Sequence, residues 1–137
     1  MIVLDTNVIS ELLRPEPDLR VLEWVWRLSG GVTTTVFNRA ELLAGVLLMP
    51  PGRRRDSLAE GLGGIMSQLG VCLPFTPECA DRYGAIVSTR TRAGRPLGTM
   101  DALIAAVALE AGATLATRDV NDFTGIGLEL INPWNEG

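Results

Sequence analysis

Residues 2–7 read Ile-Val-Leu-Asp-Thr-Asn, and this stretch decides the fold class. Its three apolar residues predict a short strand buried on both faces, which is typical of a parallel sheet. Asp5 ends that strand, at a position where a charged side chain is costly unless it has a partner. The apolar residues that follow recur at helical spacing until Pro15 ends the pattern. A buried strand that leads directly into a helix indicates an α/β protein.

Strand and helix patterns continue to alternate along the chain, which predicts a parallel sheet flanked by helices. Short β-branched and apolar runs predict further strands, at residues 32–36, 71–73, 114–117 and 128–131. Apolar residues at helical spacing predict further helices, at residues 19–29, 38–49, 58–69, 77–94 and 101–111. We therefore expect residues 1–137 to form a single α/β domain around about five parallel strands.

The chain has 137 residues, of which 47% are hydrophobic, and a formal net charge of −4. No apolar run approaches the ~20 residues of a membrane span. The first residues lack the basic flank of a secretory signal, so we expect a cytoplasmic protein. The negative net charge argues against a protein that coats nucleic acid through its overall charge, although a local basic rim could still bind RNA. All 12 basic residues are arginines, whose planar guanidinium suits phosphate groups.

The chain contains no histidine, which excludes several kinds of catalysis. Ser-His-Asp and Cys-His mechanisms are ruled out, as is zinc held by histidine. Cys72 and Cys79 do not form a zinc-binding spacing, and we expect both to be reduced thiols. Acid–base chemistry must therefore rely on carboxylates or on metal-activated water.

Four acidic residues fall where a parallel sheet would bring them together. Asp5 ends the first predicted strand, and Asp119 follows the fourth predicted strand. Glu41 lies in the first turn of the helix that follows the second strand, and Asp101 opens a buried helix. Ligands of open parallel sheets bind beyond the carboxyl ends of the strands. Clustered carboxylates repel each other, and Mg²⁺ or Mn²⁺ relieves that repulsion because these ions prefer oxygen ligands. The pattern favours metal-assisted hydrolysis of a phosphate ester.

Each acid also has a simpler structural explanation. Asp5 could be a helix cap, and Glu41 could complete a capping box with Asn38. Asp101 could favour the positive end of its helix or cap it, and Asp119 and Asp122 could be turn residues. These explanations do not account for the shared position of the acids at one edge of the sheet.

Four motifs, found in order along the chain, resemble those of PIN-domain ribonuclease toxins of the VapC family, in the FitB-like branch. They are Ile-Val-Leu-Asp-Thr-Asn-Val-Ile-Ser-Glu-Leu-Leu-Arg-Pro (2–15), Ala-Glu-Leu-Leu-Ala-Gly-Val (40–46), Gly-Thr-Met-Asp-Ala-Leu-Ile-Ala-Ala-Val-Ala (98–108), and Ala-Thr-Arg-Asp-Val-Asn-Asp-Phe (116–123) with Asn-Pro-Trp (132–134). Residues 49–70 carry none of the motifs. The resemblance implies a PIN-like fold and an endoribonuclease that uses Mg²⁺ or Mn²⁺.

The resemblance also implies roles for particular residues. Asp5 and Asp101 match direct metal ligands, Glu41 matches a residue that binds metal or its water, and Asp119 matches one that completes the second site or orients the attacking water. Many relatives have asparagine at the position of Asp119 and rely on the later acid that Asp122 matches, so both are candidate ligands. Small polar residues of the motifs match supporting positions: Thr6, Asn7 and Thr117. The implied partners are an RNA substrate, a VapB-like antitoxin and a second copy of the chain.

Arginines and tryptophans give weaker signals. Arg90, Arg92 and Arg95, like the run at residues 53–55, could form a rim that holds phosphates, or could be solvated surface charges. Trp24 and Trp26 lie on different faces of one predicted helix, so one is expected in the core and the other on a partner surface.

Three other classes of protein compete with this interpretation. A receiver-like signalling domain also binds Mg²⁺ at strand ends, but it requires a lysine, and the chain has none. A haloacid-type phosphatase requires Asp-Xaa-Asp, and position 7 is asparagine. A catalytically idle PIN fold that acts as a binding module remains open, and a nuclease assay would distinguish it.

Overall fold

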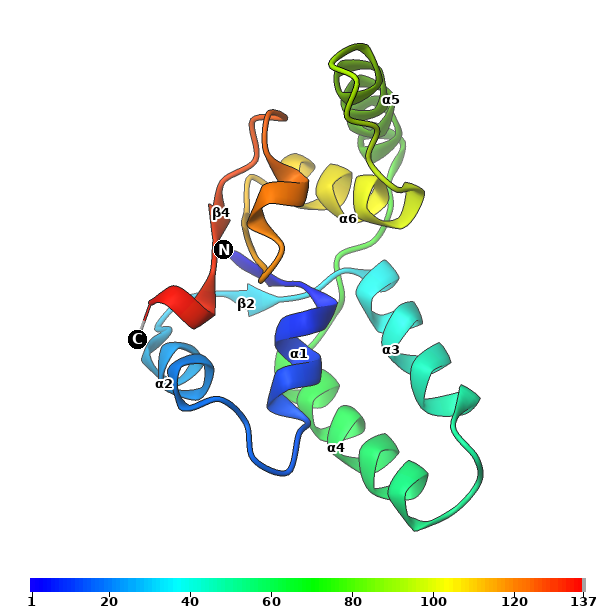
Figure 1. The fold of residues 1–137 in the computed structure, drawn as a ribbon, viewed down its shortest axis with the longest axis vertical. Coiled ribbons are helices and arrows are strands. Elements are labelled where there is room, and N and C mark those ends of the chain that lie inside the picture. The colour runs from blue at the N-terminus through cyan, green and yellow to red at the C-terminus, as the bar shows by residue number, and fades with distance from the viewer. Residues whose placement is uncertain (137) are drawn as a thin grey trace.

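The computed structural model describes residues 1–136, within which six α-helices flank a parallel sheet (Figure 1). The strands are β1 (Ile2–Leu4), β2 (Val32–Thr33), β3 (Thr114–Ala116) and β4 (Leu130–Ile131). The α-helices are α1 (Thr6–Leu12), α2 (Leu19–Arg27), α3 (Val36–Leu48), α4 (Arg53–Leu69), α5 (Pro77–Arg92) and α6 (Thr99–Glu110). Two short 3₁₀ helices follow, η1 (Val120–Phe123) and η2 (Pro133–Asn135).

The strands lie in the order β2-β1-β3-β4, and every pair is parallel. Ile2 is in register with Val32 on one side and with Thr114 on the other. All four strands therefore end at the same edge of the sheet. The α/β class and the parallel sheet predicted from the sequence are confirmed.

The predicted strand at residues 71–73 is not a strand in the structure. Leu73 forms only an isolated bridge to Thr35, through hydrogen bonds of its N–H to the carbonyl of Thr34 (2.9 Å) and of the Val36 N–H to its own carbonyl (3.0 Å). Pro74 follows at once and has no N–H to continue a ladder. Within residues 1–136 the sheet therefore has four strands and not five.

The second strand is also shorter than predicted, because one of the β-branched residues expected in it caps the next helix instead. Residues 32–36 were expected to be extended, but β2 ends at Thr33. The Thr35 hydroxyl instead accepts hydrogen bonds from the N–H groups of Phe37 and Asn38 and caps α3. A threonine at this position favours helix initiation as much as a strand.

Two hydrophobic clusters cover the two faces of the sheet. Val3 points into a cluster with residues of α5 and α6, where four alanines of α6 are fully buried. The next residue, Leu4, points into a second cluster with residues of α1, α2, α3 and α4. This alternation follows from the twofold repeat of a strand. Among the helices of residues 1–136, none combines the length and the apolar character that crossing a bilayer requires.

Candidate active site

A cavity of about 500 Å³ lies where β1 and β3 end. Besides Glu11, which pairs with Arg14, four acidic residues line it: Asp5, Glu41, Asp101 and Asp119. They come from the end of β1, from α3, from the first turn of α6 and from the segment after β3. The topology therefore brings together the four acids that the sequence placed at one edge of the sheet.

Asp5 is the most firmly held of these acids. It caps α1, accepting a hydrogen bond from the N–H of Thr6 (2.8 Å). The side chains of Asn38 (3.0 Å) and Thr117 (2.8 Å) donate to its two oxygens. Burial raises the pKa of Asp5, and the charge of Asp119 adds to this, while the three hydrogen bonds oppose the shift. Capping is thus part of its role, but two side chains from other elements also orient the carboxylate.

Glu41 does not belong to the capping box that the sequence suggested. The box is formed by Thr35 and Asn38, one turn earlier. Glu41 instead accepts a hydrogen bond of 2.7 Å from the Thr6 hydroxyl, which itself accepts one from Asn38 (3.0 Å). Its carboxylate is therefore directed toward the cavity and is not used by its own helix.

Asn38 connects two of the acids, and the sequence did not identify it as a site residue. Its side chain is fully buried, and its amide nitrogen donates both to Asp5 and to Thr6. Its amide oxygen accepts from Thr35. The spacing Thr35-Xaa-Xaa-Asn38 resembles a capping box, and this was the available signal. A capping box explains the oxygen, but it gives no indication of the contact to Asp5.

Asn7 and Thr117 connect Asp5 to the segment that carries Asp119. Asn7 donates to the hydroxyl of Thr117 (3.2 Å) and to the carboxylate of Asp119 (3.1 Å). The Thr117 hydroxyl donates to Asp5 and accepts from the N–H of Asp119 (3.1 Å). Asn7 therefore orders Asp5 through Thr117, and it also fixes Asp119.

Burial and the charges of four other acids raise the pKa of Asp101. It lies in the first turn of α6, whose N-cap is Gly98, and no side chain caps this helix. Burial raises the pKa of Asp101 to about 6, and the charges of Asp5, Glu41, Asp122 and Asp119 contribute in that order. Asp122 is exposed on η1 and affects Asp101 through its charge, but it is not among the residues that line the cavity. A cluster of mutually repelling carboxylates is the main electrostatic property of this cavity.

The donor set suits a hard divalent cation. Carboxylate oxygens are the preferred ligands of Mg²⁺, and mutual repulsion of this kind is what a cation relieves. Over residues 1–136, no three acids are grouped closely enough to enclose an ion by themselves. Mg²⁺ commonly binds through one or two carboxylates and retains several waters.

The predicted arginine rim requires a correction at Arg90. Its side chain is only 5% exposed and donates to the carbonyls of Arg95 (2.8 Å), Asp122 (2.8 Å) and Thr124 (3.0 Å). It connects α5 to η1 and is not available to bind a phosphate. Arg92 and Arg95 are exposed, so their contact with RNA stays a prediction.

The two tryptophans of α2 divide as the sequence suggested. Trp24 is 7% exposed and Trp26 is 74% exposed. The helix therefore contributes one indole to the core and presents the other to solvent.

Comparison with known proteins identifies the family. A family model described as the PIN domain matches residues 2–126. The chain is 42% identical to plasmid stability protein StbB of Pseudomonas syringae pv. tomato, over 98% of this chain and 99% of that protein. It is 39% identical to VapC ribonuclease Y4jK of Sinorhizobium fredii, over 98% of each chain. A crystal structure of FitAcB from Neisseria gonorrhoeae superposes with a TM-score of 0.90 at 38% identity, covering 98% of this chain and 99% of that one.

These likenesses extend over nearly the whole chain and agree with the motifs read from the sequence. The chain belongs to the PIN-domain family, among the VapC and FitB ribonuclease toxins.

Proposed function

We propose that the chain is an endoribonuclease that hydrolyses RNA phosphodiester bonds with Mg²⁺ or Mn²⁺ held in the carboxylate cavity. The observation that carries this proposal is the gathering of Asp5, Glu41, Asp101 and Asp119 in one cavity. The chain lacks histidine, so carboxylates are the groups available for acid–base work at this position. The protein would act as the toxin of a type II toxin–antitoxin pair, which is supported by its similarity to Toxin FitB and to a member of the VapBC family of toxin–antitoxin systems.

The residues of the cavity would divide the work as the family motifs imply. Asp5 and Asp101 would hold the cation, and Glu41 and Asp119 would bind it or orient its waters, with Asp122 as a further candidate. When bound, the cation would supply a Lewis acid that neutralises phosphate charge and activates water. Thr6, Asn7, Asn38 and Thr117 would keep the carboxylates oriented through the hydrogen bonds described above.

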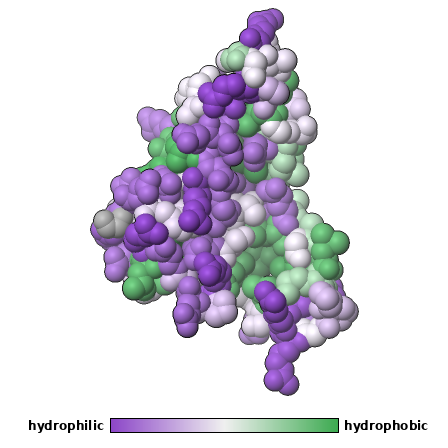
Figure 2. Space-filling model, viewed as in Figure 1, coloured by the Kyte–Doolittle hydropathy of each residue, from purple (hydrophilic) through white to green (hydrophobic). Residues whose placement is uncertain are grey.

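We also propose a protein partner and a second copy of the chain. Solved relatives include FitAB bound to a DNA fragment and VapBC2 of Rickettsia felis bound to a DNA fragment from their promoter. A cavity of about 870 Å³ lies beside the carboxylates and is lined mainly by residues of α1, α3 and α4. Apolar side chains gather over α3 and α4 in Figure 2. Leu43, Leu47 and Leu48 of α3 are exposed. Surfaces of this kind favour an antitoxin and a homodimer as partners.

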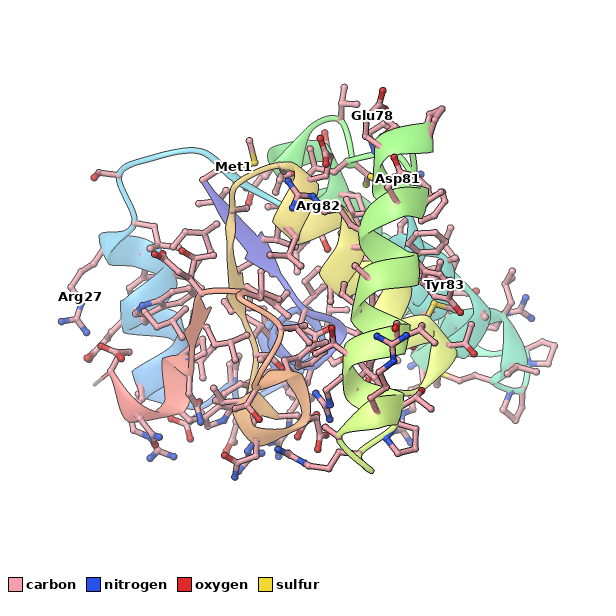
Figure 3. The ribbon with its side chains drawn as sticks, turned by 90° about the horizontal axis from the view of Figure 1, so that it is seen from above. Met1, Arg27, Glu78, Asp81, Arg82 and Tyr83 are labelled. Atoms are coloured by element: carbon pink, nitrogen blue, oxygen red, sulfur yellow. The ribbon has the colours of Figure 1, made fainter. Side chains whose placement is uncertain are left out.

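Digestion of defined RNAs with Mg²⁺, with Mn²⁺ or with EDTA tests the nuclease function. We expect cleavage with either ion and none with EDTA. Asp5→Asn and Asp101→Asn should abolish cleavage while leaving the circular dichroism spectrum unchanged. Asp81→Asn is a matched control, because Asp81 is an exposed acid of α5 (Figure 3) and should leave the rate unaltered. Cleavage that survives both cavity substitutions would contradict the assignment of the metal site, and no cleavage by the unsubstituted protein would favour a binding module.

A further inference from the structure

Arg118 and Trp134 form a stacked pair on the wall of the carboxylate cavity. The central guanidinium carbon of Arg118 lies 4.8 Å from the centroid of the Trp134 ring. Both residues line the same cavity as the four acids. Arg118 is exposed, whereas Trp134 is only 5% exposed. The indole is thus a buried base on which the guanidinium rests.

Both members of the pair are held by the surrounding chain. The N–H of Trp134 donates to the side chain of Asn132 (3.0 Å), and the indole packs in the cluster that includes α2. The N–H of Arg118 donates to the side chain of Asn7 (3.2 Å), the residue that also fixes Asp119. The position of the arginine backbone is therefore tied to the position of the carboxylates.

Within residues 1–136, the guanidinium of Arg118 makes no hydrogen bond or ion pair besides its contact with the indole. Its N–H donors can therefore bind a phosphate, and a guanidinium can do so in bidentate fashion. Arg14, the other arginine of this cavity among residues 1–136, is already paired with both oxygens of Glu11, at 3.3 and 3.2 Å. Within the same residues, no carboxylate lies within ion-pair distance of Arg118.

We propose that Arg118 binds a backbone phosphate of the RNA beside the carboxylate cavity, and that Trp134 positions it. This inference rests on the proposed nuclease function. The unpaired acids of the cavity repel the phosphate backbone, and one oriented cation on its wall gives the strand a fixed point of contact. Trp134 is covered by the arginine and is a positioning residue, so it does not stack on RNA bases.

The salt dependence of RNA binding tests this contact. The probe is a fluorescein-labelled single-stranded RNA of mixed sequence, and every protein carries Asp101→Asn so that the probe is not cut. We expect Arg118→Gln to weaken binding about fivefold and to flatten the plot of log Kd against log salt by about 0.7, the counterion release of one phosphate contact on a single strand. Arg118→Lys keeps the charge and should retain most of the slope.

A control and a coupling measurement complete the test. Arg82→Gln removes an arginine of α5 that pairs with Glu110 at the C-terminal end of α6 (3.1 Å), and it should change neither quantity (Figure 3). Trp134→Phe should weaken binding less than Arg118→Gln does and should add nothing to it in the double variant. If Arg118→Gln folds normally and leaves both affinity and slope unchanged, the stack is only structural and the inference is wrong. The proposed function is judged separately, by Mg²⁺-dependent cleavage with the unsubstituted protein.

Discussion

Asn38 has a neutral side chain whose amide oxygen and amide nitrogen make different contacts and cannot exchange places. Its oxygen accepts from Thr35 to start α3, and its nitrogen donates to Asp5 at 3.0 Å. A carboxylate at this position would keep the first contact but turn the second into a repulsion between two buried charges. Position 38 therefore requires a side chain that donates a hydrogen bond to Asp5, and a side chain of the same size without a donor does not suffice.

Asn38→Asp is accordingly expected to be more harmful than Asn38→Ala. We expect the aspartate to lower the free energy of unfolding at neutral pH by about 3–5 kcal/mol, as for an uncompensated buried charge. The alanine should cost about 1–3 kcal/mol, for the donors and acceptors it leaves without partners. Urea unfolding monitored by circular dichroism measures both. Asn121→Asp, at an exposed position, should change stability by no more than about 0.5 kcal/mol, and an equal effect at both sites would show that the contact to Asp5 is unimportant.

The raised pKa of Asp101 predicts a pH dependence with a definite sign. Folding raises this pKa from 3.8 to about 6, so the folded state binds the proton more tightly than the unfolded state does. The stabilising contribution is complete below pH 3.8 and is lost as pH rises through about 6. Without divalent ions, Asp101→Asn should therefore gain stability relative to the unsubstituted protein between about pH 4 and pH 7.

The size of this gain is limited by the partial exposure of the carboxyl group. Allowing for solvent screening, we expect about 1 kcal/mol, or roughly 3 °C in Tm. Thermal unfolding in EDTA at several pH values measures the difference. Asp81→Asn should show no such trend, and a constant difference between Asp101→Asn and the unsubstituted protein across the pH range would refute the coupling among the acids.

At the scale of elements, α4 is a helix that carries three glycines, at positions 61, 63 and 64, in its interior. A Cβ added at Gly64 would meet nothing within 4 Å, whereas one added at Gly61 would lie 3.1 Å from a methyl group of Leu13. Gly64→Ala should raise the free energy of unfolding by about 0.5–1 kcal/mol through helix propensity. Gly61→Ala should gain less, because Leu13 has to move. Thermal unfolding compares the two, and a larger gain at Gly61 would contradict the contact with Leu13.

The helices could be predicted from the sequence more reliably than the strands, for a physical reason. Long apolar stripes such as the one in α4 extend over several turns and tolerate local errors, and Thr76-Pro77 marked the start of α5 correctly. The strands have two or three residues each, which is too short for a periodic pattern. Residues 71–73 have strand composition, yet Val71 is 89% exposed and only one bridge forms.

The acidic residues of the candidate site could be predicted from the sequence, but the hydrogen bonds that orient them could not. Asp5, Glu41 and Asp119 were located from the ends of strands, because parallel topology alone brings these ends together. The hydrogen bonds of Asn38 and the burial of Arg90 depend on how distant elements pack. No local sequence pattern indicates such contacts, and from the sequence Arg90 therefore could not be distinguished from a surface charge.

For the molecule as a whole, we expect the carboxylate cavity to make stability dependent on divalent ions. Four acids at one edge of the sheet repel each other in the folded chain and are separated when it unfolds. An ion that binds only the folded state stabilises it by about 2.7 kcal/mol at a concentration 100-fold above its Kd. For a chain of this length, that corresponds to a rise in Tm of roughly 5–10 °C.

We therefore expect Mg²⁺ to raise the Tm of the unsubstituted protein in a saturable manner, and EDTA to reverse the effect. Screening of repulsion by any salt would also raise Tm, so KCl at equal ionic strength is the necessary comparison. Asp5→Asn and Asp101→Asn should each lose the specific part of the Mg²⁺ effect, because each replaces one carboxylate oxygen by an amide group. Most of the KCl effect should remain, because the other acids of the cavity are unchanged. If Mg²⁺ and KCl raise Tm equally, the acids are only a surface of negative charge, and the cavity does not hold an ion.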